Sequence, residues 1–110
     1  MKIHTRSLGD GITVLTLEGK LNMVAAPDLR KEIHSAVAAG NIRIAVDLTS
    51  VDFIDSSGLG ALINGLKTAR QAGGDLRIAS PGEQVKLVLS LTNIDRVLKA
   101  YDNAELAFSV

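Results

Sequence analysis

At 110 residues the chain is long enough to bury one hydrophobic core, and we expect residues 1–110 to form a single domain. Apolar residues make up 46% of the chain and aromatic residues only 3%, so the core must be built from Leu, Ile, Val and Ala. Twelve basic residues balance twelve acidic ones, which argues against nucleic acid or an anionic membrane as a partner. Without cysteine the chain cannot form a disulfide, a thiol nucleophile or a thiolate metal site.

Neither a secretion signal nor a membrane-spanning segment is evident in the sequence. The first twenty residues lack the apolar segment of a signal peptide. No apolar run approaches the ~18 residues that a spanning helix needs. We therefore expect a soluble protein of the cytoplasm.

The first half of the chain predicts a β-hairpin followed by a helix. Residues 2–7 and 12–18 are strand candidates, and residues 9–11 between them have strong turn chemistry. Residues 19–23 are expected to form a loop. Pro27 then opens a helix, because the first helical turn tolerates its missing N–H, and Gly40 ends it. One apolar stripe marks the buried side of this helix: Leu29, Ile33, Ala36 and Val37.

The middle of the chain predicts a buried strand and a second helix. Residues 42–48 form the strand, with one face made by Ile42, Ile44, Val46 and Leu48. The helix follows Asp55 and runs to about residue 72, where Gly73 and Gly74 end it. Its apolar residues recur at helical spacing: Leu59, Leu62, Ile63, Leu66 and Ala69.

The last third predicts two more strands and two more helices. A strand over residues 76–79 precedes Ser80–Pro81–Gly82–Glu83, which combines a capping box with proline at the first helical position. The buried side of the helix that starts there is expected to contain Val85, Val88, Leu89 and Leu91. Residues 97–101 form the last strand, and a second capping signature at residues 102–105 opens a short terminal helix with Leu106 and Phe108.

This alternation predicts an α/β fold with the order β-β-α-β-α-β-α-β-α. Helices that link short strands imply crossover connections, so the sheet should be mixed and mainly parallel, with four to five strands and about four helices. The stretch at residues 55–60 follows a central strand. It should therefore lie at the carboxyl edge of the sheet, where open α/β folds bind their ligands and partners.

Residues 55–60, Asp-Ser-Ser-Gly-Leu-Gly, are the most informative stretch of the sequence. Ser56 and Ser57 stand where a strand turns into a helix, and free backbone N–H groups at such a position favour a phosphate. Phosphorylation would add about −1.5 to −2 charges there. On the pattern alone, two serines that only cap the helix are the favoured explanation, because most serines at helix starts do only that.

The same hexapeptide resembles the phosphorylation motif of bacterial anti-sigma factor antagonists, the single-domain members of the STAS family. The resemblance extends over nearly all of the chain in element order, and it implies a STAS-like fold. It also implies that Ser56 is the phosphoacceptor, with Ser57 then left as the helix cap.

By this resemblance the protein is a phospho-switched binding protein without an active site or cofactor of its own. The unphosphorylated form would bind an anti-sigma factor that is also a serine kinase, and so release a sigma factor. Phosphorylation of Ser56 would inactivate the protein, and a phosphatase would reset it. We expect a monomer or weak dimer. Two other roles remain open: a scaffold partner in a stress-signalling assembly, and a stand-alone relative of the STAS domains on anion transporters.

A partner-binding surface is predicted around the phosphoacceptor. Glycines early in the helix leave a flat face for docking, and positions off its apolar stripe extend that face. The set predicted to bind a partner comprises Asn22, Asp55, Ser57, Gly58, Leu59, Gly60, Ala61 and Asn64. The alternative for the glycines is close packing inside the domain, especially for Gly65.

Asn22 departs from the family pattern. Anti-sigma factor antagonists usually carry an aspartate there, in a Gly-x-Leu-Asp context, whereas this chain has Gly-Lys-Leu-Asn at residues 19–22. Asparagine keeps the hydrogen-bonding carbonyl but loses the charge. Its alternative role is simply to form a turn.

Enzymatic functions are poorly supported by the sequence. A nucleophile elbow needs Gly-x-Ser-x-Gly, which is absent, and no histidine follows His34 to complete a triad. Neither His4 nor His34 has acidic residues at metal-ligand spacing, so no metal site is predicted. A small nucleotide- or anion-binding module is the remaining alternative, although the loop contains neither a Gly-x-x-x-x-Gly-Lys motif nor a basic residue.

Overall fold

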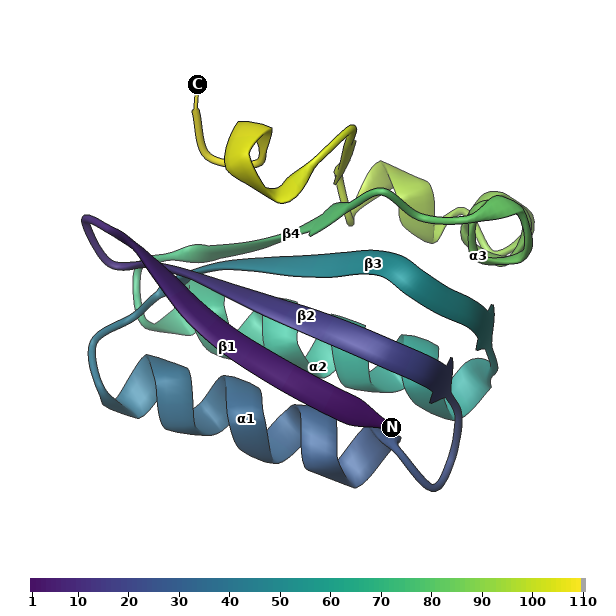
Figure 1. Cartoon of the computed structure of the whole chain (residues 1–110), viewed down its shortest axis with the longest axis horizontal. Coiled ribbons are helices and arrows are strands. Elements are labelled where there is room, and N and C mark those ends of the chain that lie inside the picture. Colours follow the sequence, from purple (N-terminus) through teal and green to yellow (C-terminus); the bar gives the residue numbers. More distant parts are fainter. Residues whose placement is uncertain (110) are drawn as a thin grey trace.

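A five-stranded sheet forms the centre of the computed structural model, which describes residues 1–109 (Figure 1). The strands lie side by side in sequence order: β1 (Lys2–Gly9), β2 (Ile12–Leu21), β3 (Arg43–Ile54), β4 (Asp75–Ala79) and β5 (Ala100–Tyr101). β1 pairs antiparallel with β2, and every other neighbouring pair is parallel. The predicted α/β class, the mixed and mainly parallel sheet and the initial hairpin are confirmed.

Two helices, α1 (Ala26–Ala38) and α2 (Ser56–Gln71), lie side by side on one face of the sheet (Figure 1). The apolar stripes expected from the sequence point into the interface between helices and sheet. The fully buried large side chains include Leu15, Leu17, Leu29, Ile33, Ile44, Leu48 and Leu62. A third helix, α3 (Glu83–Leu91), adds Val85 and Leu89 to the same core, against the carboxyl half of β3.

The C-terminal segment covers part of the opposite face of the sheet. Val14 and Ala45 alternate along their strands with residues of the main core, so they point to that other face. There they form a small cluster with Ala79, Ala104 and Ala107. Figure 1 shows the segment running above β4, on the side away from α1 and α2.

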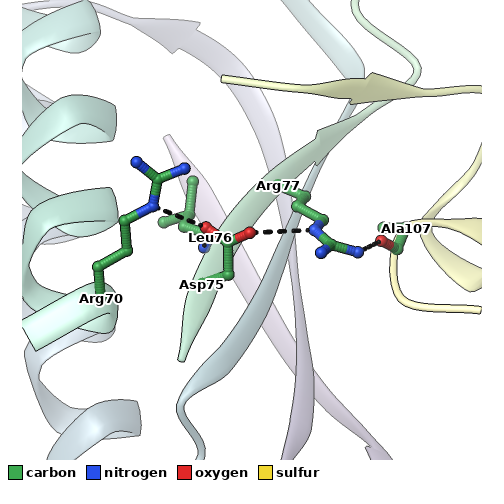
Figure 2. Close-up of polar contacts among 5 residues, drawn as sticks. All are labelled: Arg70, Asp75, Leu76, Arg77 and Ala107. Carbon is green, nitrogen blue, oxygen red and sulfur yellow. Dashed lines mark hydrogen bonds and ion pairs between the residues drawn. The ribbon is translucent and has the colours of Figure 1, made fainter. Parts of the chain in front are cut away.

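Arg77 fastens this segment to the sheet (Figure 2). Its Nη1 donates to the backbone oxygen of Ala107 at 2.7 Å, and its guanidinium lies 4.5 Å from the centre of the Phe108 ring. Asp75 accepts from Nε of Arg77 and from Nε of Arg70, each at 3.2 Å. The half-buried Arg77 thus has a carboxylate partner at Nε and a backbone acceptor at Nη1.

A second ion pair connects the segment to β1. Arg6 donates from Nη2 to Oε1 of Glu105 at 2.7 Å. This hydrogen bond lowers the pKa of the Glu105 carboxyl, with a smaller contribution from its own backbone N–H. Both side chains are well exposed, so the pair adds little to stability.

The two central strands are longer than predicted. β2 continues to Leu21 through the expected loop at residues 19–23, and β3 continues to Ile54 instead of ending at residue 48. Irregularities in the pairing between Thr16 and Lys20 let the two strands extend together. The extension of β3 contains several exposed polar residues, and they hide the apolar alternation that would have revealed it.

The region after β4 differs most from the prediction. The prediction that Ser80 caps α3 is wrong. Ser80 has a φ of +54°, and its Oγ donates to the backbone oxygen of Asp102. The helix α3 therefore begins later, after Gly82. Leu91 is 74% exposed and does not join the core. The last strand shortens to β5, and a 3-10 turn occupies residues Ile94–Arg96.

The predicted fourth helix is also wrong. Asn103 does accept from the N–H of Leu106, as its capping signature suggested, but only a 3-10 turn over Ala104–Leu106 follows. The segment of residues 104–108 is short, and Ala104, Ala107 and Phe108 all pack against the small cluster on this face of the sheet. These contacts leave only one short turn in place of a helix. Within residues 1–109, every helix is too short or too polar to cross a membrane.

Candidate functional site

The ends of β2 and β3 bring the two loops of the site together. These parallel strands are neighbours, and Leu21 pairs with Ile54 at their carboxyl ends. The chain leaves β2 at Asn22 and leaves β3 at Asp55, so both residues lie at the same edge of the sheet. This is the edge where the sequence predicted the site.

Asp55 is the cap of α2. Its backbone is extended, with a φ of −112°, and its Oδ1 accepts from the N–H of Gly58 at 2.8 Å. The prediction that Ser57 caps this helix is therefore wrong. Ser56 is already the first helical residue, whereas a cap must stand outside the helix with a non-helical backbone.

The carboxylate of Asp55 also holds the loop that follows β2. Its Oδ2 accepts from the N–H of Met23 at 3.1 Å, and the N–H of Asp55 donates to the backbone oxygen of Leu21 at 3.3 Å. Each carboxylate oxygen thus has a backbone donor, one from each loop. The start of α2 and the loop at residues 22–25 form one connected unit.

Asn22 forms the turn within that loop. Its Oδ1 accepts from the N–H groups of Val24 and Ala25 at 3.1 and 3.2 Å, and its backbone oxygen accepts from Ala25 and Ala26. The turn-forming role is confirmed. An aspartate would accept the same bonds, so the asparagine changes the charge of the site and not the shape of its loop.

Ser56 is exposed at the first position of α2, while Ser57 is only partly exposed. The positions four and eight residues after Ser56 are Gly60, partly exposed, and Asn64, exposed. Residues spaced by four share one helix face. Ser56, Gly60 and Asn64 therefore form a strip of low relief along the outside of α2.

Two exposed apolar side chains adjoin this strip, and the sequence analysis missed both. Met23 is 70% exposed and Val24 is 80% exposed in the loop that Asp55 fixes. Both are apolar residues in a short loop, outside any helix or strand period. An apolar residue in such a place could have indicated an exposed contact surface. We call Met23, Val24, Ser56, Gly60 and Asn64 the Ser56 surface.

The remaining predicted positions lie inside the domain. Leu59 and Ala61 are 6% and 0% exposed, so their side chains pack in the core and offer no surface. Gly58 is buried as well, and a Cβ there would come within 2.1 Å of the backbone oxygen of Leu21. Gly65 is held to glycine by Ile33, whose Cδ1 would lie 2.5 Å from an added Cβ. The packing interpretation holds for both glycines.

Gly60 is different from its neighbours. An added Cβ would meet only Nη2 of Arg30, at the ordinary contact distance of 3.7 Å. Packing therefore does not explain this glycine. Its lack of a side chain leaves only the exposed side chain of Arg30, from α1, beside α2 at this point between Ser56 and Asn64.

The acidic residues of this region do not form a metal site. Among residues 1–109, no three His, Asp or Glu side chains are grouped closely enough to hold an ion. Asp47 accepts instead from the N–H and the hydroxyl of Thr49, at 3.0 and 2.6 Å. The site consists of hydroxyl, amide and apolar groups around one carboxylate that is already hydrogen-bonded, which suits binding rather than catalysis.

Comparison with known proteins agrees with this geometry. Residues 8–107 match the STAS domain family. A candidate anti-sigma factor antagonist from Thermotoga maritima is 37% identical over 84% of this chain and 83% of its own length.

Solved structures match over most of the chain. The crystal structure of a candidate anti-sigma factor antagonist from Thermotoga maritima superimposes with a TM-score of 0.85 at 34% identity, covering 94% of this chain and 88% of that one. The phosphorylated form of the Bacillus cell fate determinant SpoIIAA has a TM-score of 0.72 at 19% identity, with 90% of each chain covered, and shares the fold.

Proposed function

The chain belongs to the STAS family, in the group of anti-sigma factor antagonists, and we propose that it is a partner-binding switch controlled by phosphorylation of Ser56. Proteins of this group are binding proteins and not enzymes. In the unphosphorylated form the protein binds an anti-sigma factor that is also a serine kinase, and the sigma factor is released. The proposed place of action is the cytoplasm.

One observation carries this proposal: the exposed Ser56 lies on the same low-relief face as Gly60 and Asn64, beside exposed apolar side chains. Met23 and Val24 supply apolar contact area, and Gly60 lets a partner approach the helix backbone closely. A phosphate on Ser56 would then stand inside the contact area. The kinase would bind the same surface that it phosphorylates.

The phosphate would act on the complex through its charge. A partner would have to cover and desolvate a group carrying about −1.5 to −2 charges, beside the carboxylate of Asp55. Leaving such a charge poorly paired in an interface costs several kcal/mol, which corresponds to more than about a hundredfold in affinity. Asn22 keeps a second negative charge out of this loop, so the unmodified surface presents one carboxylate whose oxygens are already hydrogen-bonded.

The experiment begins with capture of the partner from the native cell, using Ser56→Ala as bait and mass spectrometry to identify what it holds. The captured kinase is then incubated with ATP and the wild-type protein, and peptide mapping locates the phosphate. We expect phosphate on Ser56 only, and loss of binding after modification. Ser57→Ala is the matched control and should be phosphorylated normally. Phosphate on Ser57 alone, or equally tight binding by the modified protein, would contradict the proposal.

A further inference from the structure

We propose that Arg30 of α1 binds the phosphate on Ser56 within the same chain, so that the modified protein covers its own Ser56 surface. This inference rests on the proposed function, because it concerns the phosphorylated form of that site. It adds a residue that neither the hexapeptide nor the sequence analysis pointed to.

The position of Arg30 is the first argument. α1 and α2 pack side by side (Figure 1). The guanidinium of Arg30, on α1, lies beside Gly60 of α2. Its Nη2 lies 3.7 Å from the point where a Cβ of Gly60 would be. Gly60 and Ser56 occupy the same face of α2, one turn or about 6 Å apart along the helix axis.

The path from Arg30 to Ser56 runs along one face of α2. A phosphate on Ser56 would project from the outer face of α2, which is the face that the Arg30 guanidinium borders. Gly60, which stands between them, has no side chain to obstruct the path. The exposed Arg30 side chain is free to turn from Gly60 toward a phosphate about one helical turn away.

The chemistry of Arg30 is the second argument. Among residues 1–109, no Asp or Glu oxygen lies within 4.0 Å of its guanidinium, as is also true of Arg43 and Arg96, whereas Arg6, Arg70 and Arg77 have carboxylate partners. The guanidinium fork matches the geometry of phosphate oxygens and binds them through two parallel hydrogen bonds. Arg30 is thus, among the described residues, a positive charge without a carboxylate partner, about one helical turn from the residue that would gain about −1.5 to −2 charges.

The consequence is a second means of inhibition. An Arg30 guanidinium drawn from Gly60 onto the phosphate would lie over the start of α2, at Ser56 itself. A partner would then meet a covered surface as well as an added charge. The bond also has no counterpart in the unmodified protein, so it distinguishes the two states.

The test uses protein with phosphoserine incorporated at position 56 during translation, so that neither kinase nor partner is needed. Phosphorus NMR follows the second pKa of the phosphate in wild type, Arg30→Gln, Arg30→Lys and the control Lys31→Gln. Lys31 is an exposed cation on the same helix, so its loss changes the net charge equally. The Asp55 carboxylate and the backbone N–H groups of α2 are present in every variant. Their effect on the phosphate pKa is therefore the same in all of them, and the differences between variants do not include it.

We expect Arg30→Gln to raise the phosphate pKa by about 0.5 or more, a threefold or larger change in its dissociation constant, and Lys31→Gln to change it by less than about 0.2. Arg30→Lys should fall between wild type and Arg30→Gln, since it keeps the charge and loses the fork. Equal shifts in Arg30→Gln and Lys31→Gln would overturn the proposal, because only net charge would then matter. Thermal unfolding of each unphosphorylated variant checks that the fold is intact.

Failure of this inference is separable from failure of the proposed function. If phosphoserine at position 56 abolishes binding of the captured kinase while Arg30→Gln leaves the phosphate pKa unchanged, the switch stands and the role of Arg30 is wrong. If the phosphorylated protein binds the kinase as tightly as the unmodified protein, the proposed function itself is wrong.

Discussion

The carboxylate of Asp55 accepts a hydrogen bond from the backbone N–H of Met23, a residue 32 positions earlier in the chain, with 3.1 Å between Oδ2 and N. The other oxygen of the same carboxylate caps α2 through the N–H of Gly58. One side chain therefore fixes both the helix that carries Ser56 and the loop that carries the exposed apolar residues. The arrangement of the Ser56 surface depends on it.

Replacement of Asp55 tests this dependence. Asp55→Ala removes the cap and the bond to the loop, and we expect it to lower the free energy of unfolding by about 1–3 kcal/mol. Amide hydrogen exchange at Met23 should accelerate strongly. Asp52→Ala is the control, because Asp52 is exposed on β3 and caps no helix. Equal effects of the two variants on Met23 exchange would show that Asp55 does not hold the loop.

The two glycines at the start of α2 should respond oppositely to alanine. Gly58→Ala puts a Cβ 2.1 Å from the backbone oxygen of Leu21, and the forced shift should destabilise the protein by about 1–3 kcal/mol or more. Gly60→Ala meets no such obstacle and should stabilise the protein by about 0.4–1 kcal/mol, since alanine restricts the unfolded chain and favours the helix. Urea denaturation of both variants measures the difference in sign.

A long side chain at Gly60 tests the Ser56 surface as a contact area. Gly60→Arg would cover the exposed side of α2 and add a charge next to Arg30. We expect binding of the captured kinase to weaken by at least about tenfold while the cooperative thermal transition persists. Lys86→Ala, at an exposed lysine of α3 outside the Ser56 surface, serves as the control and should bind normally. Loss of the thermal transition in Gly60→Arg would mean that Gly60 serves packing instead.

Arg77 and Arg70 share Asp75 as a partner but should differ in importance (Figure 2). Arg77→Leu removes the bond to Ala107 and the contact with Phe108, and we expect a loss of about 1–3 kcal/mol in the stability of the C-terminal segment. Arg70→Gln breaks only a half-exposed pair and should cost no more than about 1 kcal/mol. Hydrogen exchange at Ala107 should accelerate in the first variant only; acceleration in both would contradict this account.

The sequence predicted helices and strands well where their apolar residues repeat at one regular spacing. Leu29, Ile33 and Ala36 recur at steps of four and three residues, the period of a helix, and they pack in the core as expected. Ile44, Val46 and Leu48 recur at steps of two residues, the period of a strand, and they do the same. The prediction failed where polar groups compete for the same backbone. Ser80 has the composition of a helix cap, yet its hydroxyl bonds to Asp102, 22 residues later, a contact that no local pattern reveals.

The place of Ser56 in the fold was predicted, and the contacts around it were not. The motif indicated Ser56 correctly as an exposed residue at the start of α2, because strand, turn chemistry and helix period all agreed there. The sequence did not show that Asp55 caps the helix. That role requires the extended backbone of Asp55, one position before α2 begins. The partners of Gly58 and Gly60 are Leu21 and Arg30, both distant in sequence, so local reasoning could not tell a packed glycine from an open one.

Phosphorylation of Ser56 should change binding without refolding the domain. The phosphate would stand at the exposed start of α2, where free N–H groups and the helix dipole favour it by roughly 0.3–1 kcal/mol. The modified protein should therefore be as stable as the unmodified protein or slightly more stable. Ser56→Asp should bind the kinase poorly, and Ser56→Ala should bind it constitutively and resist inactivation.

Amide chemical shifts of the phosphorylated and unmodified proteins distinguish this mechanism from refolding. Asp55 already fixes the backbone around Ser56 through Met23 and Gly58, so a phosphate added outside this frame has no buried bond to break. We expect changes confined to residues 50–65, the adjoining loop and Arg30, with an unchanged or raised melting temperature. Shifts spread through β4 and the first part of β2 would instead require a rearranged sheet, and they would show that the switch works by refolding.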